Sequence, residues 1–137
     1  MEEGKTEYLQ MIQNQICRMS TNSAIFKGFS ATIVAGIATI SFDRVNTWIL
    51  LLSFIPVIVF AALDIYYLKL ERKLRYLYDQ VRKDEHVVDF SIDTRLDKKA
   101  AKARTIDCVK SPSVWLFYPA MTIILVVVLV FKIMEVL

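Results

Sequence analysis

Two charged residues stand inside otherwise apolar stretches of the sequence, and their types allow specific chemistry. Lys27 lies in the apolar run 25–42, and Asp64 lies in the run 48–67. A single charge at the centre of a lipid bilayer costs roughly 3 kcal/mol, and less near its edge. An ammonium and a carboxylate in contact offset much of that cost. We therefore predict a structural intramembrane ion pair between Lys27 and Asp64, with a gating or ion-translocating role as the alternative.

A second group of polar side chains surrounds the chain's single histidine. Asp84, Glu85, His86, Asp89 and Asp93 have the donor types for a cation or a small polar ligand, but a solvated turn is the simpler interpretation. The rest of the sequence offers no nucleophile–base pair, no phosphate-binding glycine loop and no metal-ligand spacing. We therefore expect no enzyme activity, no cofactor and no metal site.

The two cysteines also lack partners for chemistry. Cys17 and Cys108 have no neighbours at metal-ligand spacing, and both lie on the side of the membrane that the charges assign to the cytoplasm. Disulfides are rare there, so we interpret both cysteines as structural or incidental.

The apolar residues are gathered in blocks that must position these groups. The chain has 137 residues, of which 55% are hydrophobic, and its mean hydropathy is +0.44. Three runs are long enough to cross the ~30 Å hydrocarbon layer as helices: 25–42, 48–67 and 114–131. The N-terminal MEEGKTEY does not resemble a cleaved signal peptide. The sequence therefore predicts an integral membrane protein.

The charge distribution predicts the orientation. Residues 68–112 hold twelve Lys and Arg, whereas the connection 43–47 holds only Arg44. The positive-inside rule places the N-terminus and residues 68–112 in the cytoplasm, and the C-terminus outside a bacterial inner membrane. Eight Asp and Glu are interleaved with the basic residues, and no basic–aromatic groove accompanies them. We therefore expect contact with anionic lipid headgroups and no nucleic acid binding.

The second span is predicted to continue without a break as a charged helix to about residue 84. Its apolar residues follow a heptad pattern typical of a coiled coil, and residues 5–23 carry a matching pattern. If the chain reverses near residue 45, residue i faces residue 90 − i, and the same register places Lys27 beside Asp64. An amphipathic helix lying in the membrane interface is the alternative for residues 5–23. The predicted stalk seam comprises Leu9, Ile12, Ile16, Met19, Leu70, Leu74, Leu77 and Val81.

The first span has a face of small residues that permits close helix approach. This face either packs against the other two spans or forms a mildly polar pore wall in an oligomer. Pro56 should kink the second span. The predicted face comprises Gly28, Ala31, Thr32, Ala35 and Gly36.

The predicted fold class is all-α, an integral membrane protein with three transmembrane helices and a cytoplasmic antiparallel helical stalk. We predict a single membrane domain over residues 1–137. Its segments are an amphipathic helix at 5–23, spans at 24–42, 48–67 and 113–134, an extended connector at 85–93 and a cytoplasmic helix at 94–110. Trp115, Phe117 and Tyr118 are expected to form an aromatic belt at the inner interface.

Three segments carry a resemblance to known proteins: IQNQICRMSTNSAIFKGFSATIVAGI, LDIYYLKLERKLRYLYDQV and SPSVWLFYP. Together they resemble a set of small bacterial three-span membrane proteins that has no established activity. The plan is also similar in architecture to SLATT-type proteins, which are proposed to act as membrane-disrupting effectors in bacterial conflict and anti-phage systems. This chain differs from that plan in its third span and in having no fused nucleotide sensor.

Three functions are compatible with this pattern. The first is a homo-oligomeric membrane-permeabilising or pore-type effector, controlled through its stalk by a cytoplasmic protein or a small ligand. The second is a non-conducting accessory or scaffold subunit that docks a cytoplasmic partner. The third is a phage holin-like protein, although the predicted external tail is short and not basic.

Overall fold

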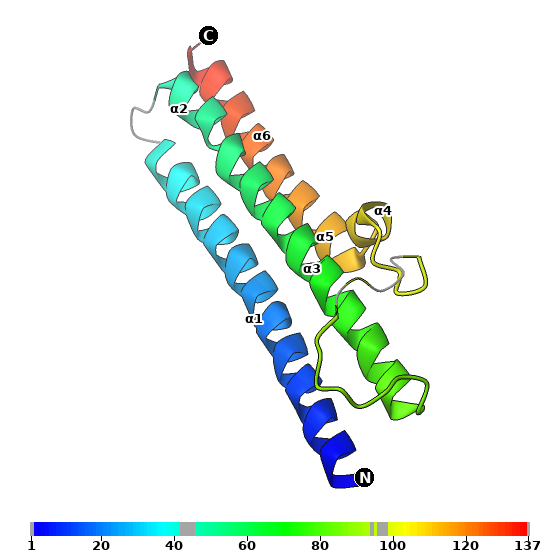
Figure 1. Cartoon of the computed structure of the whole chain (residues 1–137). Helices are drawn as coiled ribbons and strands as arrows, with labels where there is room; N and C mark the ends of the chain where they lie inside the picture. The colour runs from blue at the N-terminus through cyan, green and yellow to red at the C-terminus, as the bar shows by residue number, and fades with distance from the viewer. Residues whose placement is uncertain (1, 42–45, 94, 96–98, 137) are drawn as a thin grey trace. The chain divides into compact units, whose positions relative to one another are not determined.

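The structure of the chain is a computed structural model that describes residues 2–41, 46–93, 95 and 99–136. Over these residues the regular structure is entirely helical, which confirms the all-α prediction. The helices are α1 (Glu2–Ser41), α2 (Thr47–Leu52), α3 (Phe54–Arg82), α4 (Thr105–Val109), α5 (Pro112–Trp115) and α6 (Phe117–Val136) (Figure 1).

Three helical stretches are long and apolar enough to cross a membrane: Glu3–Ile40, Thr47–Arg82 and Pro112–Met134. This finding confirms that three helices are long and apolar enough to span a membrane, as the sequence predicts. Only 11%, 22% and 17% of their most apolar windows are buried inside the chain. Most of their apolar surface therefore faces outward. Such a surface is favourable in contact with lipid and unfavourable in contact with water. Membrane insertion and orientation stay predictions.

The chain divides into two compact units, and α1 and α3 each contribute to both. The first unit comprises Met1–Ser23 with Ile65–Lys110, and the second comprises Ala24–Asp64 with Ser111–Leu137. The two units contain different kinds of contact, so each is described by itself.

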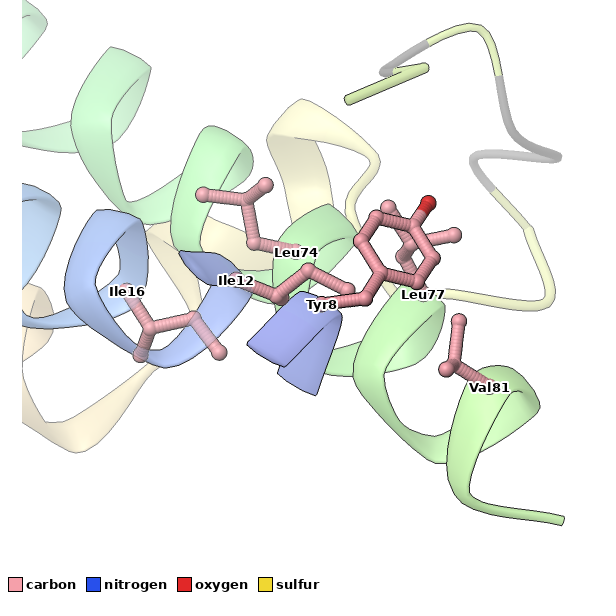
Figure 2. Close-up of a cluster of buried hydrophobic side chains, with 6 residues drawn as sticks. All are labelled: Tyr8, Ile12, Ile16, Leu74, Leu77 and Val81. Atoms are coloured by element: carbon pink, nitrogen blue, oxygen red, sulfur yellow. The ribbon is translucent and has the colours of Figure 1, made fainter. Parts of the chain in front are cut away.

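The first unit is built on an apolar cluster between α1 and α3. Figure 2 shows its side chains pointing toward one another: Tyr8, Ile12 and Ile16 come from α1, and Leu74, Leu77 and Val81 come from α3. Five members belong to the predicted seam. Tyr8 is buried in the cluster in place of the predicted Leu9, which is only partly buried, as are Met19 and Leu70. Lys5 closes the end of this contact with an ion pair to Asp84, 2.6 Å from Nζ to Oδ1.

The connector after α3 has no regular structure over 85–93. The Tyr8 hydroxyl donates a hydrogen bond to the Ser91 carbonyl oxygen at 2.5 Å, and its ring lies 5.5 Å from that of Phe90. Phe90 has a φ of 56°, in the left-handed region, so the backbone does not continue as the extended segment that the alternation of residues predicted. The connector therefore packs against Tyr8 of α1.

The prediction of one helix over 94–110 is wrong for residues 99–104, which form turns and irregular backbone; 94 and 96–98 lie outside the described residues. Only Thr105–Val109 is helical. Lys102 has a φ of 49°, and its carbonyl accepts a hydrogen bond from Arg72 Nη1 at 2.8 Å. A stripe of alanines buries little apolar area, so contacts with α3 outweigh the local helix propensity.

Prolines interrupt the second and third spans in the same way. Pro56 cannot donate a hydrogen bond to the Leu52 carbonyl, and its ring crowds that carbonyl. The helix therefore stops at Leu52, and Ser53 separates α2 from α3. Pro119 has the same relation to Trp115, where α5 ends before α6 begins. The irregularity predicted at Pro56 thus lies three residues earlier, at Ser53.

The apolar cluster gives a prediction about stability. Leu77 is fully buried, so Leu77→Ala should lower the free energy of unfolding by about 2–5 kcal/mol through lost apolar contact and a residual cavity. Val87 is 77% exposed, and Val87→Ala should change stability by less than about 0.5 kcal/mol. Thermal unfolding of the purified protein in detergent measures both. Equal effects of the two substitutions would contradict the position of the cluster.

Candidate functional site

The second unit contains the predicted ion pair between α1 and α3. Lys27 Nζ lies 2.6 Å from Asp64 Oδ2. The Asp64 side chain is fully buried, and that of Lys27 is 18% exposed. The pair lies within one residue of the register predicted from the sequence. A carboxylate without solvent contact needs a cation and hydrogen-bond donors, and Lys27 provides the cation.

Helical spacing explains why these two side chains meet. On α1, Lys27 shares a face with the buried Ser30 and Val34, three and seven residues further on. On α3, Asp64 lies seven residues after the buried Val57. Both charged groups therefore stand on the inward faces of their helices.

Aromatic rings pack beside this contact. The ring of Phe60, one turn before Asp64, is stacked with those of Phe26 and Phe29, at centroid distances of 6.1 and 6.4 Å. These contacts join the same two helices and add apolar area around the charged groups.

Tyr118 brings the third apolar helix, α6, to the same place. Its hydroxyl donates a hydrogen bond to the Phe60 carbonyl oxygen at 3.2 Å, one helical turn before Asp64, and lies close enough to the Asp64 carboxylate to interact with it electrostatically. Tyr118 is only 6% exposed, whereas Trp115 is 64% exposed. Lys27, Asp64 and Tyr118, which we call the polar triad, therefore connect α1, α3 and α6 within the second unit.

Tyr118 is the residue of this site that sequence reasoning missed, because it was assigned to an aromatic belt. The signal available was its position on a helical stripe. Val114, Tyr118 and Leu125 are all buried, at spacings of four and seven residues. A tyrosine on such a stripe brings a hydroxyl into the interior, and a buried hydroxyl needs a hydrogen-bond partner.

Ser30 is a further polar group on the inward face of α1. Its side chain is 1% exposed, and its Oγ has no hydrogen-bond partner among the described residues. A buried hydroxyl without a partner costs roughly 1–3 kcal/mol. The span therefore carries an unsatisfied polar atom one helical turn from Lys27.

One of the two predictions for the small-residue face of α1 was that it packs against the other two spans. Within the described residues it does not. Gly28, Thr32, Ala35 and Gly36 are exposed and Ala31 is half-buried. A Cβ added at either glycine would meet no described atom within 4 Å. Larger side chains on the opposite side, such as Phe26 and Val34, make the internal contacts instead.

The hydroxyls on this face are satisfied within the helix. Thr32 Oγ1 donates to the Gly28 carbonyl at 2.9 Å, and Thr39 Oγ1 donates to the Ala35 carbonyl at 2.8 Å. A face whose polar atoms are already paired can lie against lipid or against another helix.

The acidic group around His86 is held by internal hydrogen bonds. Asp89 accepts hydrogen bonds from Ser91 N at 2.9 Å and from Ser91 Oγ at 2.8 Å, and these bonds lower the pKa of its carboxyl. Asp84 pairs with Lys5. Among the described residues, no three His, Cys, Asp or Glu side chains are grouped as a metal site would require.

The two cysteines differ in their surroundings. Cys17 is exposed on α1, and Cys108 is buried on α4. Burial raises the pKa of the Cys108 thiol, which makes it less reactive as a nucleophile.

Comparison with known proteins adds no assignment: the chain matches no family model, no curated protein and no solved structure.

The buried ion pair gives a direct prediction. Lys27→Leu or Asp64→Leu should each lower the free energy of unfolding by about 3–5 kcal/mol, because each leaves the other charge buried without its partner. The double substitution removes both charges and should recover most of that loss. Thermal unfolding in detergent measures the three variants, and Lys83→Leu, at an exposed position, is the control. Equal loss in the single and double variants would show that the pair is not structural.

Proposed function

We propose that the protein is an oligomeric effector of the bacterial inner membrane that changes membrane permeability, with the polar triad holding the closed state. The observation that carries this proposal is the meeting of a partly buried lysine with a buried aspartate and a buried tyrosine from the three apolar helices. An inert membrane anchor needs no buried charges, and they cost free energy in lipid. Charged groups placed there are a common feature of ion pathways and gates.

The unsatisfied Ser30 hydroxyl supports a second conformation. A buried polar atom without a partner raises the free energy of the state in which it occurs. If rotation of α1 turned Ser30 toward water or a neighbouring subunit, that atom would be satisfied. The same rotation would separate Lys27 from Asp64. The Lys27–Asp64 ion pair would thus stabilise the closed state, and the Ser30 hydroxyl on the same helix would destabilise it.

A pore requires several copies of this chain, and the exposed face of α1 suits such an assembly. Gly28 and Gly36 allow close approach of another helix, and Thr32 and Thr39 offer hydroxyls to water when their internal bonds open. We place this face at the contact between subunits. By the positive-inside rule, residues 68–112 lie in the cytoplasm, where a protein or small-ligand trigger would reach the first unit.

A second candidate function is a non-conducting subunit that docks a cytoplasmic partner. The observation that favours it is the group of exposed apolar side chains on the connector after α3. Val87, Val88, Phe90 and Ile92 are between 37% and 77% exposed. Several exposed apolar side chains in one short segment suit a protein contact.

Membrane permeability distinguishes the two functions. At equal membrane expression, Lys27→Leu and Asp64→Leu should depolarise bacteria several-fold faster than the wild type without any trigger, because each breaks the contact that keeps the protein closed. The double variant should return toward the wild-type rate. A voltage-sensitive dye reports the rate in cells, and dye efflux from proteoliposomes repeats it with the purified protein.

A glycine substitution tests the subunit contact in the same assays. Gly36→Leu should suppress the leak of the Asp64→Leu variant and reduce chemical crosslinking between copies, because a large side chain prevents close approach. Gly4→Leu is the matched control, since Gly4 also has open space around it but lies in the first unit. Absence of depolarisation by both single charge variants would contradict the effector function and favour the docking subunit.

A further inference from the structure

We infer that the first unit contains a binding site for a phosphate-type anion, in a hollow between α3 and the turn that includes Lys102. The hollow has a volume of about 330 Å³ and is lined by Arg72, Arg75 and Lys102, with Tyr76 and Asp79. Small-ligand sites occupy roughly 300–1,000 Å³, so this hollow fits a small phosphate ester or one lipid headgroup. The site does not depend on the permeability function proposed above.

The charges around the hollow favour an anion. Three cationic side chains line it against one carboxylate, that of Asp79. Asp79 is already paired with Arg82, at 3.2 Å between Oδ1 and Nη2. Arg82 therefore partly balances Asp79, as Glu71 partly balances Arg75, and the charges of Arg72 and Lys102 leave the lining positive on balance.

The backbone of Lys102 is strained in a way that fits a binding site. Its φ of 49° is uncommon for a residue other than glycine and costs free energy. The conformation is held by two hydrogen bonds, from Arg72 Nη1 to the Lys102 carbonyl and from Lys102 N to the Lys99 carbonyl at 3.2 Å. Strained residues of this kind cluster at ligand-binding positions, and here the strain places a lysine beside two arginines.

The side chains favour phosphate over other anions. Guanidinium groups bind two oxygens of a phosphate at once, and Arg75 is 60% exposed, so it can turn toward a ligand from its pair with Glu71. Gln80 Nε2 donates a hydrogen bond to the Tyr76 hydroxyl at 3.0 Å, which leaves the hydroxyl proton available to a ligand oxygen. A phosphate monoester offers the several acceptor oxygens that these donors require.

Binding of pyrophosphate to the full-length protein tests the site. The affinity is measured by isothermal titration calorimetry in detergent at about 0.15 M salt. Salt at this concentration screens non-specific attraction between pyrophosphate and exposed charges. The Arg75→Gln/Lys102→Gln variant should bind at least tenfold more weakly than the wild type. Arg18→Gln is the control, since Arg18 is an exposed arginine of the same unit that does not line the hollow. Equal weakening by the control would overturn the site.

A lipid is the other source of the same chemistry. Nanodiscs containing phosphatidic acid, compared with phosphatidylcholine alone, test it by native mass spectrometry of retained lipid, with the same variants. Retention that depends on Arg75 and Lys102 would assign the headgroup as the ligand, whereas pyrophosphate binding alone would assign a free phosphate. Binding of neither ligand would overturn the inference.

If the double variant fails to fold, Lys102→Gly provides a second test of the role of Lys102. Glycine adopts this φ without strain, so the substitution should raise the melting temperature while weakening pyrophosphate or phosphatidic acid binding several-fold. Unchanged binding in this variant would contradict the role of Lys102.

Discussion

The arrangement of the second unit depends on one constraint: Asp64 is fully buried and must be balanced. Lys27 is its cation, and that requirement determines which residue of α1 lies beside α3. Tyr118 places a residue of α6 beside the same carboxylate. A buried ion pair adds little net stability compared with apolar side chains, but it penalises every arrangement that separates its members. The polar triad therefore contributes specificity of packing more than stability.

Different interactions stabilise the packing of α1 against α3 in the two units. In the first unit an apolar cluster around Ile12 and Leu77 excludes water, so the hydrophobic effect stabilises it. In lipid that effect is absent between helices, and polar contacts with close packing must replace it. The change from an apolar cluster to the triad along the same two helices is what a helix pair leaving a membrane would require.

The sequence was informative where a pattern repeats and uninformative where a single contact decides. Heptad spacing and the reversal near residue 45 were enough to predict the pairing of Lys27 with Asp64 and most of the apolar cluster. Tyr118 escaped because nothing local distinguishes a buried tyrosine from one at a membrane interface. The helix expected over 94–110 failed because Arg72, thirty residues away in sequence, takes the Lys102 carbonyl. Long-range hydrogen bonds of that kind leave no periodic signal.

Charge reversal at Lys27 and Asp64 tests the central claim most directly. The measurement is the melting temperature of the purified protein for Lys27→Asp, Asp64→Lys and the two substitutions together. Each single reversal places two like charges in contact and should abolish the cooperative transition, whereas the swapped pair should restore it. A swapped variant no more stable than the single reversals would contradict the claim that this pair holds the helices in register.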